Sequence, residues 1–269
     1  MAADKPLTLR RQKGRSTTRA RQSSESFQVD VLVDTGVFHL EQPFSYFLPE
    51  ELEAVIDAGS LIKVPFKNDL RNGVVLSIKE KSQASLKPVH SLLTQVRLSQ
   101  SFLEFTKKVS ERYIANQASI LSACLPSFTK VMNTSLDAST LHRSKSSKPA
   151  RKLFLLNRLE AVESRVVRHI KERKGLNLLV ILPTQREIEG VIKALGVIDQ
   201  QIIEIGSHLT SSQRRRNFEL AATATSIIVI GTRSAIMAPM AHIDEILIAE
   251  ESVEHFQEQK APYWNVRDM

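Results

Sequence analysis

The hydrophobic period of this chain differs between the part before residue 97 and the part after residue 150, and no other sequence feature constrains its fold as strongly. From Phe27 to about residue 97, short runs alternate apolar and polar residues between Pro and Gly, as half-buried β-strands do. After residue 150, apolar runs of strand length alternate with segments whose apolar residues recur every three or four positions. Strands that alternate with helices of this length form βαβ units and a parallel sheet. The sequence therefore predicts a mixed α/β protein with a β-rich N-terminal domain and a parallel α/β domain.

A compact β module is expected over residues 27–97, because turn-forming Pro and Gly residues separate its apolar runs. Its strand-like runs are 27–33, 44–48, 61–66 and 73–78. Ser99 then has the character of a helix N-cap, and apolar residues follow it at helical spacing as far as Tyr113. A second short helix is predicted over residues 117–124.

The segment 151–269 is predicted to form the parallel α/β domain. Its predicted strands are 153–156, 178–182, 201–205, 226–230 and 245–249. Amphipathic helices are expected between the earlier strands, the first ending at Gly175 and the third covering about 211–221.

The net charge of +8 is concentrated in two segments that are poor in large apolar residues. Residues 1–26 hold seven Lys/Arg and two acids, and residues 129–152 hold six Lys/Arg and one acid. We expect a disordered basic tail in the first segment and a basic linker in the second. Flexible basic segments bind phosphate without reading sequence, although a solubilising tail and a plain linker explain the charge equally well.

Cysteine content and the length of apolar runs exclude several classes of protein. Cys124 is the single cysteine, which excludes an internal disulfide, a four-cysteine zinc site and a redox cysteine pair. The longest apolar runs, 178–182 and 227–230, are far shorter than the ~20 residues of a membrane helix. We therefore expect a cytoplasmic protein without a membrane partner.

The α/β segment lacks the phosphate loop that a nucleotide site in such a domain would need. That loop has the pattern G-x-x-x-x-G-K-[ST], and none of the nine glycines begins one. The predicted strand 153–156 is followed by Glu160, whose carboxylate near the turn would repel a triphosphate. A bound nucleotide is therefore not expected.

Two acids follow the last predicted strand, in the sequence Ala249-Glu250-Glu251. Carboxylates in such a place can hold Mg²⁺, but acids also stabilise a helix N-terminus, and this second interpretation is favoured. The histidines do not show the spacing of metal ligands, and residue order alone does not indicate a pair of nucleophile and general base. No catalytic residue and no metal site are predicted.

The run Gly231-Thr232-Arg233-Ser234 directly follows a predicted strand. Gly231 can turn the chain tightly, and the hydroxyls, the guanidinium and the backbone amides can hold a phosphate. An ordinary strand-to-helix turn capped by Thr232 explains the same residues. The sequence leaves both interpretations open.

The longer run from Gly231, GTRSAIMAP, resembles the GTRSA-x-x-AP signature of the PriA family of bacterial replication-restart proteins, also called primosomal protein N′. Weaker similarities follow the family order in segments 43–49, 64–66, 113–126 and 250–268. The resemblance covers about residues 27–269. It implies a β-rich domain that captures DNA 3′ ends over 27–97, a winged-helix-like segment with a basic linker over 98–150, and one RecA-like helicase lobe over 151–269.

Departures from the family pattern shape the expected function. The family's phosphate loop GVTGSGKT is absent, Ala249 replaces the Asp that begins its DEEH box, and Ser252 replaces the His of that box. The sequence ends at Met269, before the family's second lobe and zinc-binding cysteines. The family uses ATP, Mg²⁺ and Zn²⁺, and because their motifs are missing we expect no cofactor in this chain. The resemblance then implies a degenerate nucleotide site made of Glu160, Ala249, Glu250 and Glu251.

The resemblance also implies two groups of DNA-binding residues. Phe44 could stack on a terminal base, Ser45 stands where the family has an Asp that faces the 3′-hydroxyl, and Lys67 stands where it has a Gly. Alternatively, Phe44, Tyr46 and Phe66 are simply the core of a small β domain. The second group comprises Thr232, Arg233 and Ser234.

The expected function is therefore that of a DNA-binding protein of replication restart, which recognises stalled or branched forks and helps to assemble the primosome without ATPase activity. The expected partners are DNA that is forked or has a free 3′ end, primosome and replicative helicase-loading proteins, and single-stranded DNA-binding protein. One alternative is an active ATP-dependent 3′-to-5′ DNA helicase of the same family. Another is a non-enzymatic scaffold whose basic segments only solubilise it.

Overall fold

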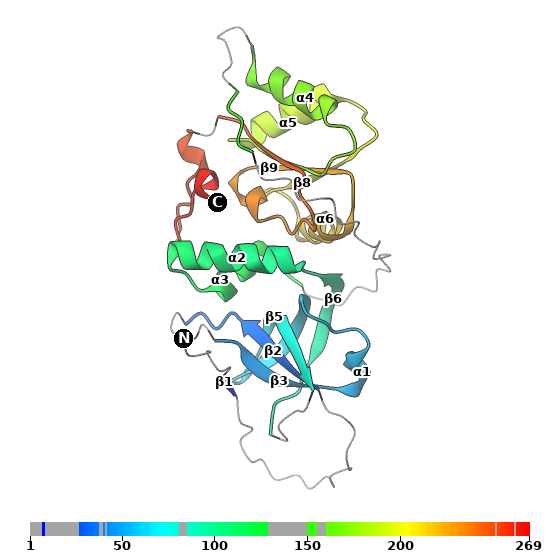
Figure 1. Cartoon of the computed structure of the whole chain (residues 1–269), viewed down its shortest axis with the longest axis vertical. Helices are drawn as coiled ribbons and strands as arrows, with labels where there is room; N and C mark the ends of the chain where they lie inside the picture. Colours follow the sequence, from blue (N-terminus) through cyan, green and yellow to red (C-terminus); the bar gives the residue numbers. More distant parts are fainter. Residues whose placement is uncertain are drawn as a thin grey trace. The chain divides into compact units, whose positions relative to one another are not determined.

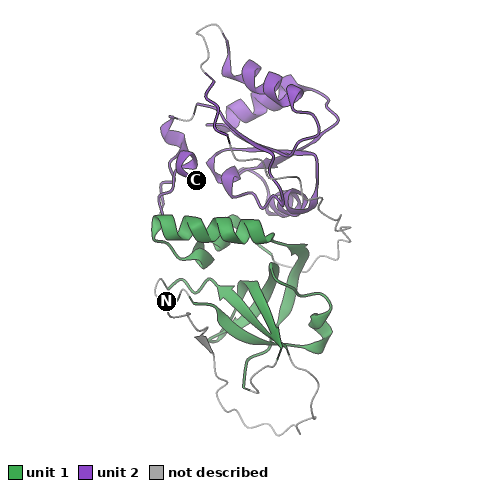
Figure 2. Cartoon of the chain, viewed as in Figure 1, with its two compact units in different colours: residues 1–136 green, residues 137–269 purple. Residues whose placement is uncertain are grey.

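The computed structural model describes residues 7–8, 27–37, 40, 42–80, 85–128, 150–154, 160–250, 252–260 and 262–269. The chain forms two compact units, residues 1–136 and 137–269 (Figure 2). The sheet of the first unit is largely antiparallel, and the sheet of the second is parallel throughout. The predicted mixed α/β class, with a β-rich N-terminal part and a parallel sheet, is confirmed.

In the first unit, six strands within the described residues form one sheet (Figure 1). In order across the sheet they are β1 (Leu7–Thr8), β3 (Phe44–Leu48), β2 (Phe27–Val33), β5 (Asp69–Glu80), β4 (Ser60–Phe66) and β6 (Ser91–Arg97). β1 runs parallel to β3, and the other neighbouring strands are antiparallel. Lys67 lies in the tight turn between β4 and β5 with a φ of 52°.

The two faces of this sheet differ because side chains alternate along each strand. On β2, Val29, Val31 and Val33 are buried in a core that also contains Phe44 and Tyr46. Burying each of these side chains stabilises the fold by roughly 1.5–3 kcal/mol. The alternate residues of β2 lie on the opposite face, where the candidate site is found.

Three helices complete the described part of the first unit (Figure 1). They are α1 (Glu50–Glu53), α2 (Gln100–Tyr113) and α3 (Gln117–Cys124). Ser99 caps α2 as predicted, because its side chain accepts the backbone N–H of Phe102 over 3.2 Å. Asn116 caps α3 in the same way, through the backbone N–H of Ala118 at 2.8 Å.

In the second unit, four strands within the described residues form a parallel sheet (Figure 1). Their order is β10 (Glu245–Ile248), β7 (Leu178–Ile181), β9 (Ile227–Gly231) and β8 (Gln201–Ile205). β7 and β9, in the middle of the sheet, are buried along their whole length. A strand that is covered on both faces has a continuous apolar sequence, which explains why the sequence pattern predicted β7 and β9 well.

Helices cover both faces of this parallel sheet. They are α4 (Val162–Glu172), α5 (Gln185–Leu195) and α6 (Ser211–Thr223), followed by the 3₁₀ turns η1 (Arg233–Met237), η2 (Glu254–Phe256) and η3 (Val266–Asp268). α4 and α5 pack together on one face, and α6 lies on the other (Figure 1). Capping boxes at Thr184 with Glu187, and at Thr210 with Gln213, fix where α5 and α6 begin.

Most predicted elements agree closely with the structure. The strands 27–33, 44–48 and 201–205 and the helix 117–124 have the predicted bounds, and other elements shift by a few residues. The sequence analysis predicts no strand over Ser91–Arg97, where β6 is found. It predicts a strand over 153–156, but Leu153 and Phe154 lie outside any strand, and residues 155–156 are outside the described part.

Several predictions fall wholly or partly on residues that the structure does not describe. Within the expected basic tail, 1–26, only β1 is described, and the expected basic linker is described only from residue 150. Within the winged-helix-like segment, the described residues 98–128 form α2 and α3, so the winged-helix assignment stays a prediction. In the part of the chain that is described, no helix is long and apolar enough to span a membrane.

Candidate nucleic-acid interface

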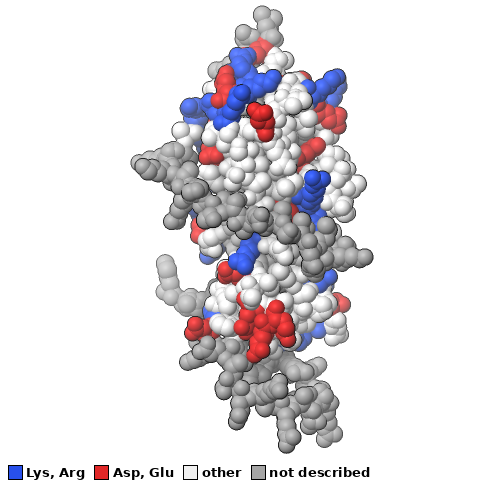
Figure 3. All heavy atoms as spheres, turned by 90° about the vertical axis from the view of Figure 1, so that its right-hand side faces the viewer, with Lys and Arg blue, Asp and Glu red and all other residues white. Residues whose placement is uncertain are grey.

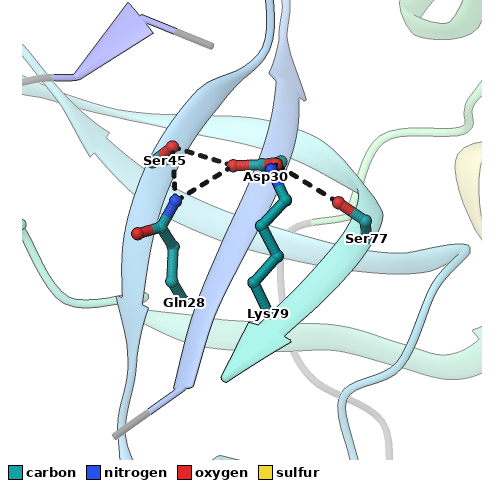
Figure 4. A network of polar contacts seen from close by, with 5 residues as sticks. All are labelled: Gln28, Asp30, Ser45, Ser77 and Lys79. Atoms are coloured by element: carbon teal, nitrogen blue, oxygen red, sulfur yellow. Dashed lines mark hydrogen bonds and ion pairs between the residues drawn. The ribbon is translucent and has the colours of Figure 1, made fainter. Parts of the chain in front are cut away.

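A network of polar side chains lies across three neighbouring strands of the first unit (Figure 4). Gln28 and Asp30 come from β2, Ser45 from β3, and Ser77 and Lys79 from β5. The strand register places both Ser45 and Ser77 directly opposite Asp30. Because paired residues of antiparallel strands point to the same side, the network gathers on the face opposite the apolar core.

Asp30 is the centre of this network. Its Oδ1 accepts hydrogen bonds from Ser45 Oγ at 2.8 Å and Gln28 Nε2 at 3.4 Å. Its Oδ2 accepts one from Ser77 Oγ at 3.2 Å and forms an ion pair with Lys79 Nζ. The Asp30 side chain is 6% exposed, whereas that of Lys79 is 50% exposed, so the network joins a buried carboxylate to an ammonium group at the surface.

The protonation state of Asp30 follows from these contacts. Burial raises the pKa of its carboxyl, but hydrogen bonds from Lys79, Ser45 and Gln28 and the Lys79 charge outweigh that effect. The pKa of Asp30 therefore lies below its ordinary value. At neutral pH the site presents an ionised hydrogen-bond acceptor next to a cation.

The predicted residues Phe44, Ser45 and Lys67 are not equally accessible. Phe44 is 3% exposed and packs edge-to-face on Phe66 with ring centroids 5.3 Å apart, so it is a core residue and is not open to a base. Ser45 is fully buried, and its Oγ bridges Asp30 and Gln28. Lys67 is exposed, and its ammonium lies 5.8 Å from the centroid of the Phe66 ring.

The predicted stacking of Phe44 on a terminal base is therefore wrong, because strand alternation places Phe44 in the core. Phe44 and Ser45 are neighbours on β3, so they point to opposite faces of the sheet. Ser45 joins the polar network, and Phe44 joins the apolar core. Only one of the two can face a ligand from the polar side.

The other four members of the network were not predicted from the sequence: Gln28, Asp30, Ser77 and Lys79. A signal for two of them exists, because Gln28 and Asp30 are polar residues two positions apart in an otherwise apolar strand. No local pattern links them to Ser77 and Lys79, which lie on β5.

The Gly231–Ser234 run begins at the end of β9, as predicted. A Cβ on Gly231 would lie 2.3 Å from the carbonyl oxygen of Ile205, so close backbone packing requires glycine here. Thr232 is half-buried and Ser234 exposed. The structure places both hydroxyls at the carboxyl edge of the sheet, where parallel α/β domains bind ligands.

Arg233 already has protein partners within its own unit. Its Nε donates to Glu258 Oε2 at 3.1 Å, and its guanidinium also reaches the His255 carbonyl oxygen at 3.4 Å. Burial raises the pKa of Glu258, but hydrogen bonds from the Lys260 backbone and Arg233 outweigh that effect, so its pKa lies below the ordinary range. A phosphate at this loop would compete with Glu258 for Arg233.

The described residues of the expected degenerate nucleotide site lie in different environments. Glu160 forms an ion pair with Arg168 of α4. Ala249 is 7% exposed and belongs to the apolar core of the second unit. Glu250 follows β10 with a φ of 53°, and Glu251 lies outside the described residues. Among the described residues, no group of three or more His, Cys, Asp or Glu could hold a metal ion.

Comparison with known proteins identifies the first unit. Residues 30–126 match the family model of the PriA 3′DNA-binding domain (3′BD). This range contains Asp30, Ser45, Ser77 and Lys79 and continues through α3. All members of the candidate network except Gln28 therefore lie within the matched domain.

The similarity to PriA proteins extends beyond this domain. The chain is 21% identical over 269 residues to the probable replication restart protein PriA of Mycobacterium tuberculosis (strain CDC 1551 / Oshkosh), covering 87% of this chain and 40% of that protein. It is 26% identical over 248 residues to PriA of Helicobacter pylori (strain J99), covering 84% and 38%. With PriA of Bacillus subtilis (strain 168) it shares 29% identity over 106 residues, covering 38% and 13%.

The chain spans about two fifths of the length of the first of these relatives. Both of its units fall within the range of similarity, since 84–87% of the chain aligns with several PriA proteins. The first unit therefore contains a 3′DNA-binding domain of the PriA type, and the chain beyond it is similar to PriA replication restart proteins.

Proposed function

We propose that this protein binds DNA at stalled or branched replication forks through a 3′-end site centred on Asp30, and that it takes part in replication restart without hydrolysing ATP. The observation that carries the proposal is the polar network of Asp30, Ser45 and Lys79 inside the matched 3′DNA-binding domain. The curated relatives are named as replication restart proteins, which supports the same process for this chain.

The chemistry of the network suits a terminal nucleotide. A 3′-hydroxyl is a hydrogen-bond donor, and the ionised Asp30 carboxylate is a strong acceptor for it. The longest contact of Oδ1 is the one from Gln28, at 3.4 Å, and in our proposal the 3′-hydroxyl takes its place. Lys79, half exposed beside the carboxylate, then approaches the adjacent phosphodiester.

This arrangement also accounts for the replacement of the family's Asp by Ser45. Ser45 Oγ donates to Asp30, so the neighbouring strand supplies a carboxylate within one hydrogen bond of the substituted position. An internal nucleotide has a phosphodiester in place of the 3′-hydroxyl and so offers an anion instead of a donor. Repulsion from Asp30 would then disfavour it.

The absence of ATPase activity is part of the proposal. The sequence contains no phosphate loop, and Ala249 provides no ligand for Mg²⁺ at the end of β10. Phosphate release by the purified chain, with and without forked DNA, should therefore stay at the level of a blank without protein. A DNA-stimulated rate above that blank would favour the alternative, an active helicase.

The partners follow from the same proposal. DNA that is forked or has a free 3′ end is the ligand of the first unit, and the Thr232–Ser234 loop is offered as a second phosphate contact. Primosome proteins, replicative helicase-loading proteins and single-stranded DNA-binding protein are proposed as protein partners, in the bacterial cytoplasm. Mixing the purified chain with each of them on a fork, followed by size-exclusion chromatography, tests these proposed partners.

The direct test of the site compares two forks that differ only at the leading-strand end, with either a 3′-hydroxyl or a 3′-phosphate. A hydrogen bond to a charged acceptor contributes about 1.5–3 kcal/mol, so we expect roughly a tenfold or greater preference for the hydroxyl. Asp30→Asn should remove the preference. Asp57→Asn, which removes the exposed carboxylate paired with Arg97 at 2.9 Å, is the matched control and should keep it.

Equal affinity of the natural chain for the two forks would contradict the 3′-end site. If Asp30→Asn loses its fold, Lys79→Gln provides a second variant. The Lys79 side chain is half exposed, so its replacement disturbs the fold less. In our proposal Lys79→Gln weakens binding of both forks, because it removes a phosphate contact, while the preference for the hydroxyl remains.

A further inference from the structure

The described start of the second unit contains an aromatic side chain that is both exposed and held in place. Phe154 is 42% exposed. The guanidinium of Arg165 lies over its ring, 4.7 Å from the centroid, and the His169 imidazole meets it edge-on with centroids 5.7 Å apart. His169 is itself fixed by Glu245, with 2.7 Å between Nε2 and Oε1. The ring is thus positioned before any ligand arrives.

Arg165 lies over this ring, and two further cations are close to it in the sequence. Arg151 and Lys152 are exposed and precede it in the sequence. None of the ion pairs between described residues involves Arg151, Lys152 or Arg165, whereas the nearby Arg168 is paired with Glu160. Figure 3 shows Lys and Arg side chains together with several Asp and Glu side chains on the second unit, at the height where Figure 1 places α4 and α5.

We propose that Arg151, Lys152, Phe154 and Arg165 form a contact surface for single-stranded DNA, here called the Phe154 surface. An accessible, positioned aromatic ring offers a stacking partner for any base, because every base has a π-face. The three cations offer phosphate contacts that do not depend on sequence. Bases within a duplex are already stacked on each other, so the ring selects single strands.

The Phe154 surface does not rest on the 3′-end site of the first unit. It lies in the other compact unit and contains neither an Asp30-like acceptor nor a group that reads a strand end. The two sites can therefore be tested separately with a DNA strand whose 3′ end carries a phosphate. An acidic protein segment is the competing occupant, and it would make no use of a free base.

The experiment uses the full chain and a fluorescein-labelled oligothymidylate with a 3′-phosphate, followed by anisotropy at several salt concentrations. The variants are Phe154→Leu, Phe154→Ala and Arg165→Gln. Stacking on one base is worth ~1–3 kcal/mol, so both Phe154 variants should bind at least about fivefold more weakly. Arg165→Gln should also weaken binding and flatten the log–log salt slope by roughly 0.7.

The matched control is Arg214→Gln, which removes an exposed cation of α6, on the other face of the sheet from α4. Its affinity should remain close to that of the natural chain. A blunt duplex should bind all Phe154 variants and the natural chain equally. An equal loss for the duplex would overturn the stacking role, because charge alone would then explain binding.

The fold of every variant is checked by the fluorescence of Trp264, which is 8% exposed and lies in the same unit. If Phe154→Ala loses its fold, Phe154→Leu retains an apolar side chain of similar length and decides the question. Ultraviolet crosslinking of a bromodeoxyuridine strand should then map to Phe154 in the natural chain. Affinities of Phe154→Leu and Arg165→Gln that match Arg214→Gln, with no crosslink at Phe154, would overturn the Phe154 surface.

Discussion

Ser45 Oγ donates a hydrogen bond of 2.8 Å to Asp30 Oδ1 across the β2–β3 pair. Both side chains are buried, yet the Asp30 carboxylate is linked to the surface through Lys79. Through this link, Asp30 and Ser45, which no local sequence pattern connects, belong to one polar site. The first prediction tests how much it contributes to stability.

Asp30→Asn is expected to destabilise the first unit. The substitution keeps the shape of the side chain but removes the charge that accepts hydrogen bonds from Ser45, Ser77 and Lys79. Leaving such partners poorly satisfied costs about 1–3 kcal/mol. Hydrogen-exchange mass spectrometry should show faster exchange of the β2 and β3 amides.

Asp57→Asn serves as the control for this measurement, because its carboxylate is 60% exposed and surface ion pairs contribute little. Exchange in β2 that is the same for Asp30→Asn and Asp57→Asn would show that the network does not stabilise the sheet.

Acid should destabilise the second unit through Glu245. Burial raises the pKa of this carboxyl, but hydrogen bonds from Arg173 at 2.8 Å and from His169 outweigh that effect, so its pKa lies below the ordinary value. A lowered pKa stabilises the fold above the pKa of the unfolded chain, ~4.3, and this contribution is lost as the pH falls through the folded value. Glu245→Gln should therefore flatten the loss of stability below about pH 4.

The pH series is measured by urea denaturation followed through Trp264 fluorescence. Glu172→Gln, an exposed acid at the end of α4, is the control and should keep the acid dependence of the natural chain. An identical acid dependence for Glu245→Gln and the natural chain would contradict the assignment.

Gly231→Ala is expected to destabilise the second unit by about 1–3 kcal/mol or more. The new Cβ would lie 2.3 Å from the Ile205 carbonyl oxygen and 2.7 Å from the Ala235 Cβ, and the backbone oxygen cannot move aside cheaply. Thermal unfolding measures the effect. Gly206→Ala is a useful comparison, since the atoms nearest to its new Cβ belong to the flexible His208 side chain. A smaller loss for Gly231→Ala than for Gly206→Ala would contradict the packing argument.

Deletion of residues 1–26 is expected to weaken binding to all DNA shapes alike. This segment holds seven Lys/Arg, and for each phosphate that is no longer neutralised the log–log salt slope should flatten by roughly 0.7 on single strands and 0.9 on duplex. Anisotropy titrations at several salt concentrations measure the slope. An unchanged slope would mean that the cations of this segment make no phosphate contacts.

Local sequence patterns were sufficient to locate most strands and helices and to indicate a parallel sheet in the second unit. Such elements depend on local periodicity and caps: the alternation in 27–33, the continuous apolar run of β7, and Ser99 before α2 are all visible within one segment. The strand β6 was not predicted, because part of its burial depends on pairing with β4.

The set of residues that forms the site depends on long-range strand pairing and not on a local pattern. Asp30 meets Ser45, Ser77 and Lys79 from positions 15, 47 and 49 residues away, and their approach depends on the register of three strands. Strand alternation also separated Phe44 from Ser45, although the family resemblance implied that they share one pocket. The local sequence shows which side chains of a strand share a face. Strand pairing then decides which face points to the core and which residues of other strands lie beside it, and pairing is a long-range property of the fold.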